Sequence, residues 1–164
     1  MRRITPVAIG FAVLLSGGPA AALPPLPPVA GLLDVCYSAT VAEAAAKGGR
    51  LGWERMDEAR LASWRAGFER GGRTVDVVGW FRGPREEDGL LSFWTMPAPD
   101  GQRVCSYSVG QAAGLLDGLS HALGAPGRAE AAGEVNMAGW TRAAGEVSFV
   151  QVGAAALITV THLP

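Results

Sequence analysis

The clearest helical pattern in the chain precedes Gly124. Apolar residues recur there at spacings of three and four, so they share one face of an α-helix, while the polar residues fall largely outside that face. Gly124 follows the last leucine directly and suits a left-handed C-terminal cap. The pattern predicts a helix over 112–123. Its apolar stripe consists of Ala112, Leu115, Leu116, Leu119, Ala122 and Leu123.

Two shorter helices are predicted upstream of this one. The alanine-rich segment 40–47 has Ser38 or Thr40 as its N-cap candidate and is followed by Gly48-Gly49, which ends it. The segment 57–68 has a looser apolar stripe and precedes a second glycine pair. Both patterns are typical of short surface helices that cover a sheet.

Strand-like runs occur in two sets of three, in the same order, and each set follows a helix-like segment. This order favours an internal repeat that divides the chain at about residue 110, into 30–110 and 111–164. Trp80 and Trp140 occupy matching places in the two sets and are expected to anchor the core, because tryptophan buries a large area. The first set is 78–82, 91–94 and 104–108, and the second is 138–142, 147–150 and 157–161.

The connections between these runs are short and rich in glycine, proline and aspartate. Such connections favour antiparallel hairpins, because parallel neighbours need a crossover of about a dozen residues or more. The predicted fold class is therefore α+β. Two α-β-β-β units are expected to form one antiparallel sheet of about six strands, with the helices on one face.

The N-terminus has the pattern of a cleavable signal peptide. Arg2 and Arg3 precede an apolar run, and three alanines after it provide the small residues that a signal peptidase recognises. The alternative is a retained membrane anchor, but the apolar run is shorter than the roughly 20 residues that span a bilayer. The expected organisation is a signal peptide (1–22), a proline-rich spacer (23–29) and a single exported α+β domain (30–164).

Export changes the reading of the charges and of the cysteines. Removal of Arg2 and Arg3 leaves twelve of the fourteen basic residues against fifteen acidic ones, a net charge of about −3. This charge argues against a nucleic-acid partner and against a polybasic contact with a membrane surface. In a periplasmic or extracellular location, Cys36 and Cys105 are expected to form a disulfide, with two buried free thiols as the alternative.

A catalytic pattern is present in the segment 106–110, where a serine lies between a predicted strand and a predicted helix. A nucleophile elbow has that placement. Ser108 would be the nucleophile, with His162 or His121 and Asp117 as its partners. The alternative is that Ser108 begins or caps the following helix. Two histidines far apart in sequence, without a third ligand at a recognisable spacing, predict no metal site, and no motif predicts a cofactor.

Trp94 gives the leading functional hypothesis. Neighbouring residues of a strand point to opposite faces of a sheet, so Ser92, Trp94 and Met96 face away from the helices if Phe93 faces them. An exposed tryptophan and an exposed methionine on a helix-free sheet face indicate a surface that binds a partner.

We therefore expect an exported binding domain without catalytic activity. Its partner would be another envelope protein or a second copy of the chain, bound through the open sheet face. A small exported serine hydrolase that uses Ser108 is the alternative. A purely structural role in an envelope assembly also remains open, because fold alone does not determine function.

Overall fold

A computed structural model of the protein describes residues 28–97, 101–143 and 145–162. The predicted signal peptide and residues 23–27 of the predicted spacer lie outside the described residues. In the described part of the chain, no helix combines the length and the apolar character needed to cross a membrane.

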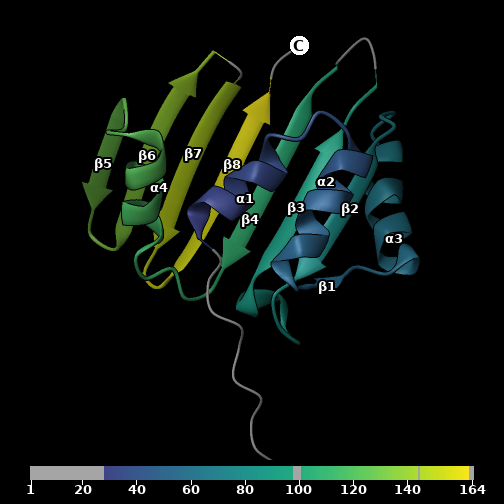
Figure 1. Cartoon of the computed structure of the whole chain (residues 1–164), viewed down its shortest axis with the longest axis horizontal. Coiled ribbons are helices and arrows are strands. Elements are labelled where there is room, and N and C mark those ends of the chain that lie inside the picture. Colours follow the sequence, from purple (N-terminus) through teal and green to yellow (C-terminus); the bar gives the residue numbers. More distant parts are fainter. Residues whose placement is uncertain (1–27, 98–100, 144, 163–164) are drawn as a thin grey trace, which may run out of the picture.

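Eight strands form one antiparallel sheet, in the order β1-β2-β3-β4-β8-β7-β6-β5 (Figure 1). The α+β class and the single antiparallel sheet are thereby confirmed, but the expected number of about six strands is too low. The strands are β1 (Glu54–Arg55), β2 (Asp76–Phe81), β3 (Leu90–Thr95), β4 (Arg103–Val109), β5 (Arg128–Ala132), β6 (Val135–Arg142), β7 (Gly145–Val152) and β8 (Ala155–His162).

The two additional strands are the edges of the sheet. β1 has only two residues and β5 has the sequence Arg-Ala-Glu-Ala-Ala, and every residue of both strands is exposed. Neither strand has the β-branched or aromatic residues, or the alternation, by which a strand is recognised in a sequence. Each half of the sheet is therefore a four-stranded meander, and the predicted α-β-β-β units are not confirmed.

The two meanders meet at the antiparallel pair of β4 and β8, where Ser106 lies opposite Thr159. Their internal registers correspond. Gly79 lies opposite Ser92 in one meander, and Gly139 lies opposite Ser148 in the other. This correspondence allows positions in the two halves to be compared residue by residue.

Three helices cover one face of the sheet: α1 (Val29–Cys36), α2 (Val41–Gly48) and α4 (Leu115–Leu123) (Figure 1). The predictions over 40–47 and 112–123 are confirmed to within three residues at either end. Thr40 is the N-cap of α2, because its Oγ1 accepts a hydrogen bond of 3.1 Å from the Glu43 backbone N–H. α1 was not predicted.

The fourth helix, α3 (Glu58–Glu69), packs on the opposite face of the sheet. Val78 and Trp80 of β2 belong to the main core with α1, α2 and α4, whereas Val77 and Phe81 of the same strand pack with Leu61 of α3. Residues that alternate along a strand point to opposite faces. The prediction that all helices share one face is therefore wrong for α3.

The main core is built around large aromatic side chains from both meanders. Trp80 and Trp140 are 1% and 2% exposed, and Phe93 and Phe149 are fully buried, which confirms the predicted role of the two tryptophans. A disulfide joins Cys36 of α1 to Cys105 of β4, as predicted. A disulfide in the core is compatible with an oxidising, exported location.

Candidate interaction surface

The three residues of the predicted binding site, Ser92, Trp94 and Met96, do not form one exposed surface in the structure. Trp94 does lie on the face opposite to α1, α2 and α4, and its Nε1 donates a hydrogen bond of 2.8 Å to Ser92 Oγ. Its ring, however, stacks on Trp64 of α3 with the ring centroids 5.1 Å apart, and Ser92 is only 5% exposed. Met96 lines a hollow beside Thr40 at the start of α2. α3 thus covers most of the surface that the sequence assigned to a partner.

Beyond α3, the same side of the sheet carries no helix among the described residues. Cys105 of β4 faces α1 through the disulfide, so Ser106 and Ser108 point to the other side. We call the helix-free side of β4, β8, β7 and β6 the open face. It is a continuous surface, because these four strands are neighbours in the sheet.

A row of apolar side chains crosses the open face at right angles to the strands. Met137 of β6 lies opposite Val150 of β7, which lies opposite Leu157 of β8. Met137 is 38% exposed and Leu157 is 42% exposed. We call these three residues the apolar row. Large apolar side chains that are contiguous and exposed are typical of a surface that binds a protein partner.

Small polar residues form the next row. Ser148 lies opposite Thr159, which lies opposite Ser106. Gly139 continues this row onto β6. The hydroxyl groups can donate and accept hydrogen bonds at the border of an apolar contact, in the way that polar rims surround the apolar centres of protein interfaces.

A hollow of about 440 Å³ lies over Gly139, beside the apolar row. Its lining includes Met137, Ser148, Val150 and Arg128. A Cβ atom added to Gly139 would meet one atom of the described residues within 4 Å, the Val147 carbonyl oxygen at 3.9 Å. Because Gly139 has no side chain, its backbone forms the floor of the hollow.

The matching position in the other meander, Gly79, is filled. A Cβ atom there would lie 2.7 Å from Met56 Sδ and 3.3 Å from the Leu91 carbonyl oxygen. Met56 is 4% exposed and packs with Leu61 of α3. The molecule thus covers one of the two glycines with its own methionine and leaves the other open.

This contrast predicts opposite effects of alanine at the two glycines. Gly79→Ala is expected to lower the free energy of unfolding by about 1–3 kcal/mol, because the new methyl group displaces the buried Met56 side chain. Gly139→Ala is expected to raise it by about 0.5–1 kcal/mol, because alanine restricts the unfolded chain and the folded chain has room for it. Urea denaturation of both variants measures the two changes.

Each glycine variant serves as the control for the other, because both replace a glycine in a central part of a β-meander by the same residue. Equal losses of stability in the two variants would mean that the space over Gly139 is occupied, and would contradict the hollow.

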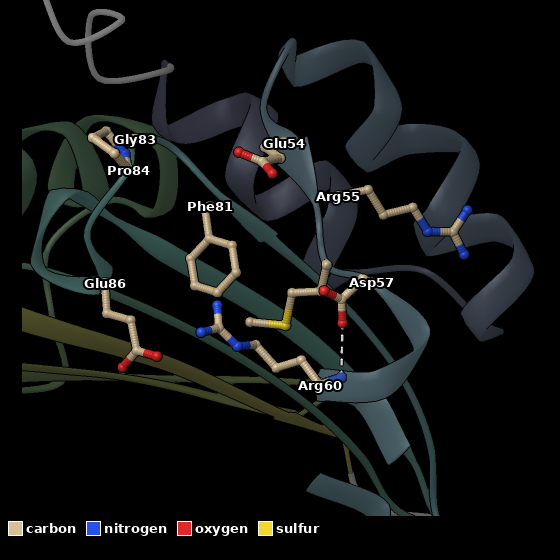
Figure 2. Close-up of a pocket in the computed structure, with 9 residues that line it drawn as sticks. Glu54, Arg55, Asp57, Arg60, Phe81, Gly83, Pro84 and Glu86 are labelled. Atoms are coloured by element: carbon tan, nitrogen blue, oxygen red, sulfur yellow. Dashed lines mark hydrogen bonds between the residues drawn. The ribbon is translucent and has the colours of Figure 1, made fainter. Parts of the chain in front are cut away.

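A second, smaller hollow of about 180 Å³ lies beside the edge strand β1 and the start of α3 (Figure 2). The guanidinium group of Arg60 lies over the Phe81 ring, 4.8 Å from its centroid. The Arg60 backbone N–H donates a hydrogen bond of 2.8 Å to Asp57 Oδ1, which caps the helix. The contact of Arg60 with Phe81 joins α3 to β2 and places a positive charge of the protein itself beside the aromatic ring that lines the hollow.

The structure does not bring the predicted catalytic residues together. Ser108 points to the open face, whereas the buried ring of His162 lies on the helix side, with Nε2 3.1 Å from the Cys36 carbonyl oxygen. His121 and Asp117 are exposed on α4, which also lies on the helix side. The sheet separates Ser108 from both histidines. Among the described residues, no group of three His, Cys, Asp or Glu side chains could hold a metal ion.

Tyr107 of β4 is a buried titratable group that the sequence analysis did not single out. Burial raises the pKa of its hydroxyl to about 12. The ring packs against Trp53 with the centroids 5.6 Å apart, and the hydroxyl has no hydrogen-bond partner among the described residues. Since Tyr107 lies in the core and not beside the open face, its perturbed pKa concerns stability.

This pKa predicts a loss of stability at alkaline pH. Tyr107 keeps its proton in the folded state up to about pH 12, whereas the unfolded chain loses that proton near the ordinary pKa of 10.0. Stability from this residue is complete below pH 10 and falls as the pH rises toward 12. Urea denaturation at pH 9 and pH 11.5 should show a smaller loss for Tyr107→Phe than for the unaltered protein. An equal loss would contradict the assignment.

No protein-family model, curated protein or solved structure matches this chain.

Proposed function

We propose that this protein is an exported binding domain without catalytic activity, and that its open face docks another exported protein. The observation that carries the proposal is the apolar row. Met137, Val150 and Leu157 are direct neighbours on three adjacent strands, and no helix among the described residues covers them. Burial of such side chains by a partner lowers the free energy of the complex by roughly 25 cal/mol for each Å² of apolar surface removed from water.

Two further observations support the proposal. The separation of Ser108 from His121 and His162 by the sheet favours binding over hydrolysis. The disulfide between Cys36 and Cys105 supports a periplasmic or secreted location, since such bonds persist where the surroundings are oxidising. The expected partner is therefore a protein of the same compartment, and the signal peptide over 1–22 would deliver the domain there.

The internal repeat is part of the same proposal. The corresponding registers at Gly79 and Gly139 support two meanders derived from one unit. In this proposal α3 is an addition to the first meander and covers one side of its strands. The same side of the second meander has no such helix among the described residues and binds the partner.

The proposal predicts that a charge in the apolar row abolishes binding without unfolding the domain. Leu157→Asp is expected to lower the free energy of unfolding by about 1 kcal/mol, because the side chain is 42% exposed and aspartate is unfavourable in a strand. It is expected to weaken partner binding by about tenfold or more, because a bound partner would bury the new carboxylate. The two measurements are urea denaturation and quantitative recovery of the partner from the exported fraction.

Ala42→Asp is the matched control, because Ala42 is exposed on α2 on the opposite side of the sheet. It adds the same charge and should leave partner recovery unchanged. Recovery that is equal for Leu157→Asp and the unaltered protein, with both proteins folded, would overturn the proposal. Recovery of a second copy of the chain would assign the open face to self-association.

A further inference from the structure

We infer that the hollow over Gly139 receives a long, unbranched apolar side chain, such as methionine, from an amphipathic helix of the partner. This inference rests on the proposed function and specifies the chemistry of the partner. It follows from the way in which the protein covers the matching half of its own sheet.

The segment that contains Met56 and α3 shows how that half is covered. The Met56 backbone N–H donates a hydrogen bond of 2.9 Å to the Gly79 carbonyl oxygen, and the Met56 side chain fills the space over Gly79. α3 follows directly. Its Leu61 and Trp64 pack on the same face, where Trp64 stacks on Trp94.

The residues that receive this segment have counterparts on the open face. Val77 and Trp94 are cross-strand neighbours that pack with α3. Met137 and Val150 are the matching pair on the open face, and they are also cross-strand neighbours. Met137 precedes Gly139 by two residues, as Val77 precedes Gly79. Val150 follows Ser148 by two residues, as Trp94 follows Ser92. Both pairs are apolar, but the second pair lacks a covering helix among the described residues.

The edge strand β5 leaves the hollow open. Arg128 lies opposite Gly139, and Met56 lies beside Gly79 in the other meander through its backbone hydrogen bond to the Gly79 carbonyl oxygen. The Arg128 side chain is 76% exposed and pairs with Glu130 through an Nη2–Oε1 contact of 2.8 Å. The hollow is thus flanked by an ion pair and lined by Met137 and Val150.

The shape of the hollow determines which side chain fits. Gly139 forms the floor, and Met137, Ser148 and Val150 are among the residues that line the hollow around it, so an incoming group reaches the backbone beside these side chains. Methionine is unbranched and adapts its three torsions to irregular gaps. A helix that places further apolar residues one and two turns after it would lie on the apolar row, as helices do in apolar grooves.

The chain's own segment 54–69 provides the probe, as a synthetic peptide. The intact protein, labelled with ¹⁵N, is titrated with this peptide and followed by NMR. We expect saturable shifts of the amide signals of Gly139, Ser148 and Val150. A control peptide with Met56→Glu and Leu61→Glu should bind at least about tenfold more weakly, because it presents charge to an apolar surface.

Two protein variants complete the test. Gly139→Leu fills the hollow and should abolish the shifts, while the open space over Gly139 lets the variant fold, which its thermal unfolding checks. Ser148→Tyr places a large ring in the lining of the hollow at an exposed position and should have the same effect, so the conclusion does not depend on one variant.

Several outcomes would overturn the inference: no shifts at Gly139 with the unaltered peptide, equal binding of the control peptide, or shifts that persist in Gly139→Leu. Recovery of the partner separates this inference from the proposed function. If Leu157→Asp loses the partner and Gly139→Leu retains it, the open face binds but the hollow does not take part. If Leu157→Asp retains the partner, the proposed function itself is wrong.

Discussion

Replacement of Cys36 and Cys105 together by alanine is expected to lower the free energy of unfolding by about 4 kcal/mol. The disulfide joins residues 69 positions apart, so it restricts a large part of the unfolded chain. It also fixes α1 to β4, the strand at which the two meanders meet. Urea denaturation of the double variant and of the oxidised protein gives the difference.

The reductant supplies the control for this prediction. Dithiothreitol should destabilise the unaltered protein by a similar amount and should leave the double alanine variant unchanged. A loss below about 1 kcal/mol would mean that the closed loop contributes little to stability.

Trp140→Ala is expected to lower the free energy of unfolding by about 3–5 kcal/mol. The side chain is 2% exposed, and its Nε1 donates a hydrogen bond of 2.8 Å to the Gly124 carbonyl oxygen at the end of α4. The variant therefore leaves both a cavity in the core and a carbonyl oxygen without its donor. Thermal and urea denaturation measure the loss.

Met137→Ala is the matched control, because Met137 lies three residues earlier on the same strand and points to the open face. It should change the free energy of unfolding by about 0.5 kcal/mol or less. Comparable losses in the two variants would show that both sides of β6 are core, and the open face would lose its basis.

The sequence predicted the parts of the fold that have periodic apolar residues. The stripe before Gly124 and the alanine-rich segment after Thr40 correspond to α4 and α2. The chain has two cysteines, so the disulfide predicted for an exported protein had one possible pair. The alternation around Phe93 also placed Trp94 on the correct face of the sheet.

The remaining features depend on contacts that no local pattern contains. The apolar residues of α3 predict a helix with one buried side, but they do not tell which sheet face that side meets. For this reason the sequence left Trp94 exposed, although Trp64 covers it. The run of Leu32, Leu33, Val35 and Cys36 was the available signal for α1, but a helix of eight residues after prolines gives little periodicity.

The hollow over Gly139 also could not be predicted from the sequence. Gly79 and Gly139 occur in similar local sequences, and both lie in strands. Only the fold shows that Met56 fills the space over Gly79 and that Arg128, held by Glu130, leaves the space over Gly139 open. The difference arises at the two edges of the sheet, where the strands β1 and β5 were among the elements that the sequence did not reveal.

The central claim is that the open face, and not the helix side, meets the partner. Site-specific photo-crosslinking in cells that produce the protein tests it most directly, with the crosslinker at Leu157 on the open face and at Ala42 on α2. The proposed function predicts one discrete adduct from Leu157 and none from Ala42. An adduct from Ala42 alone, or adducts of equal yield from both positions, would contradict it.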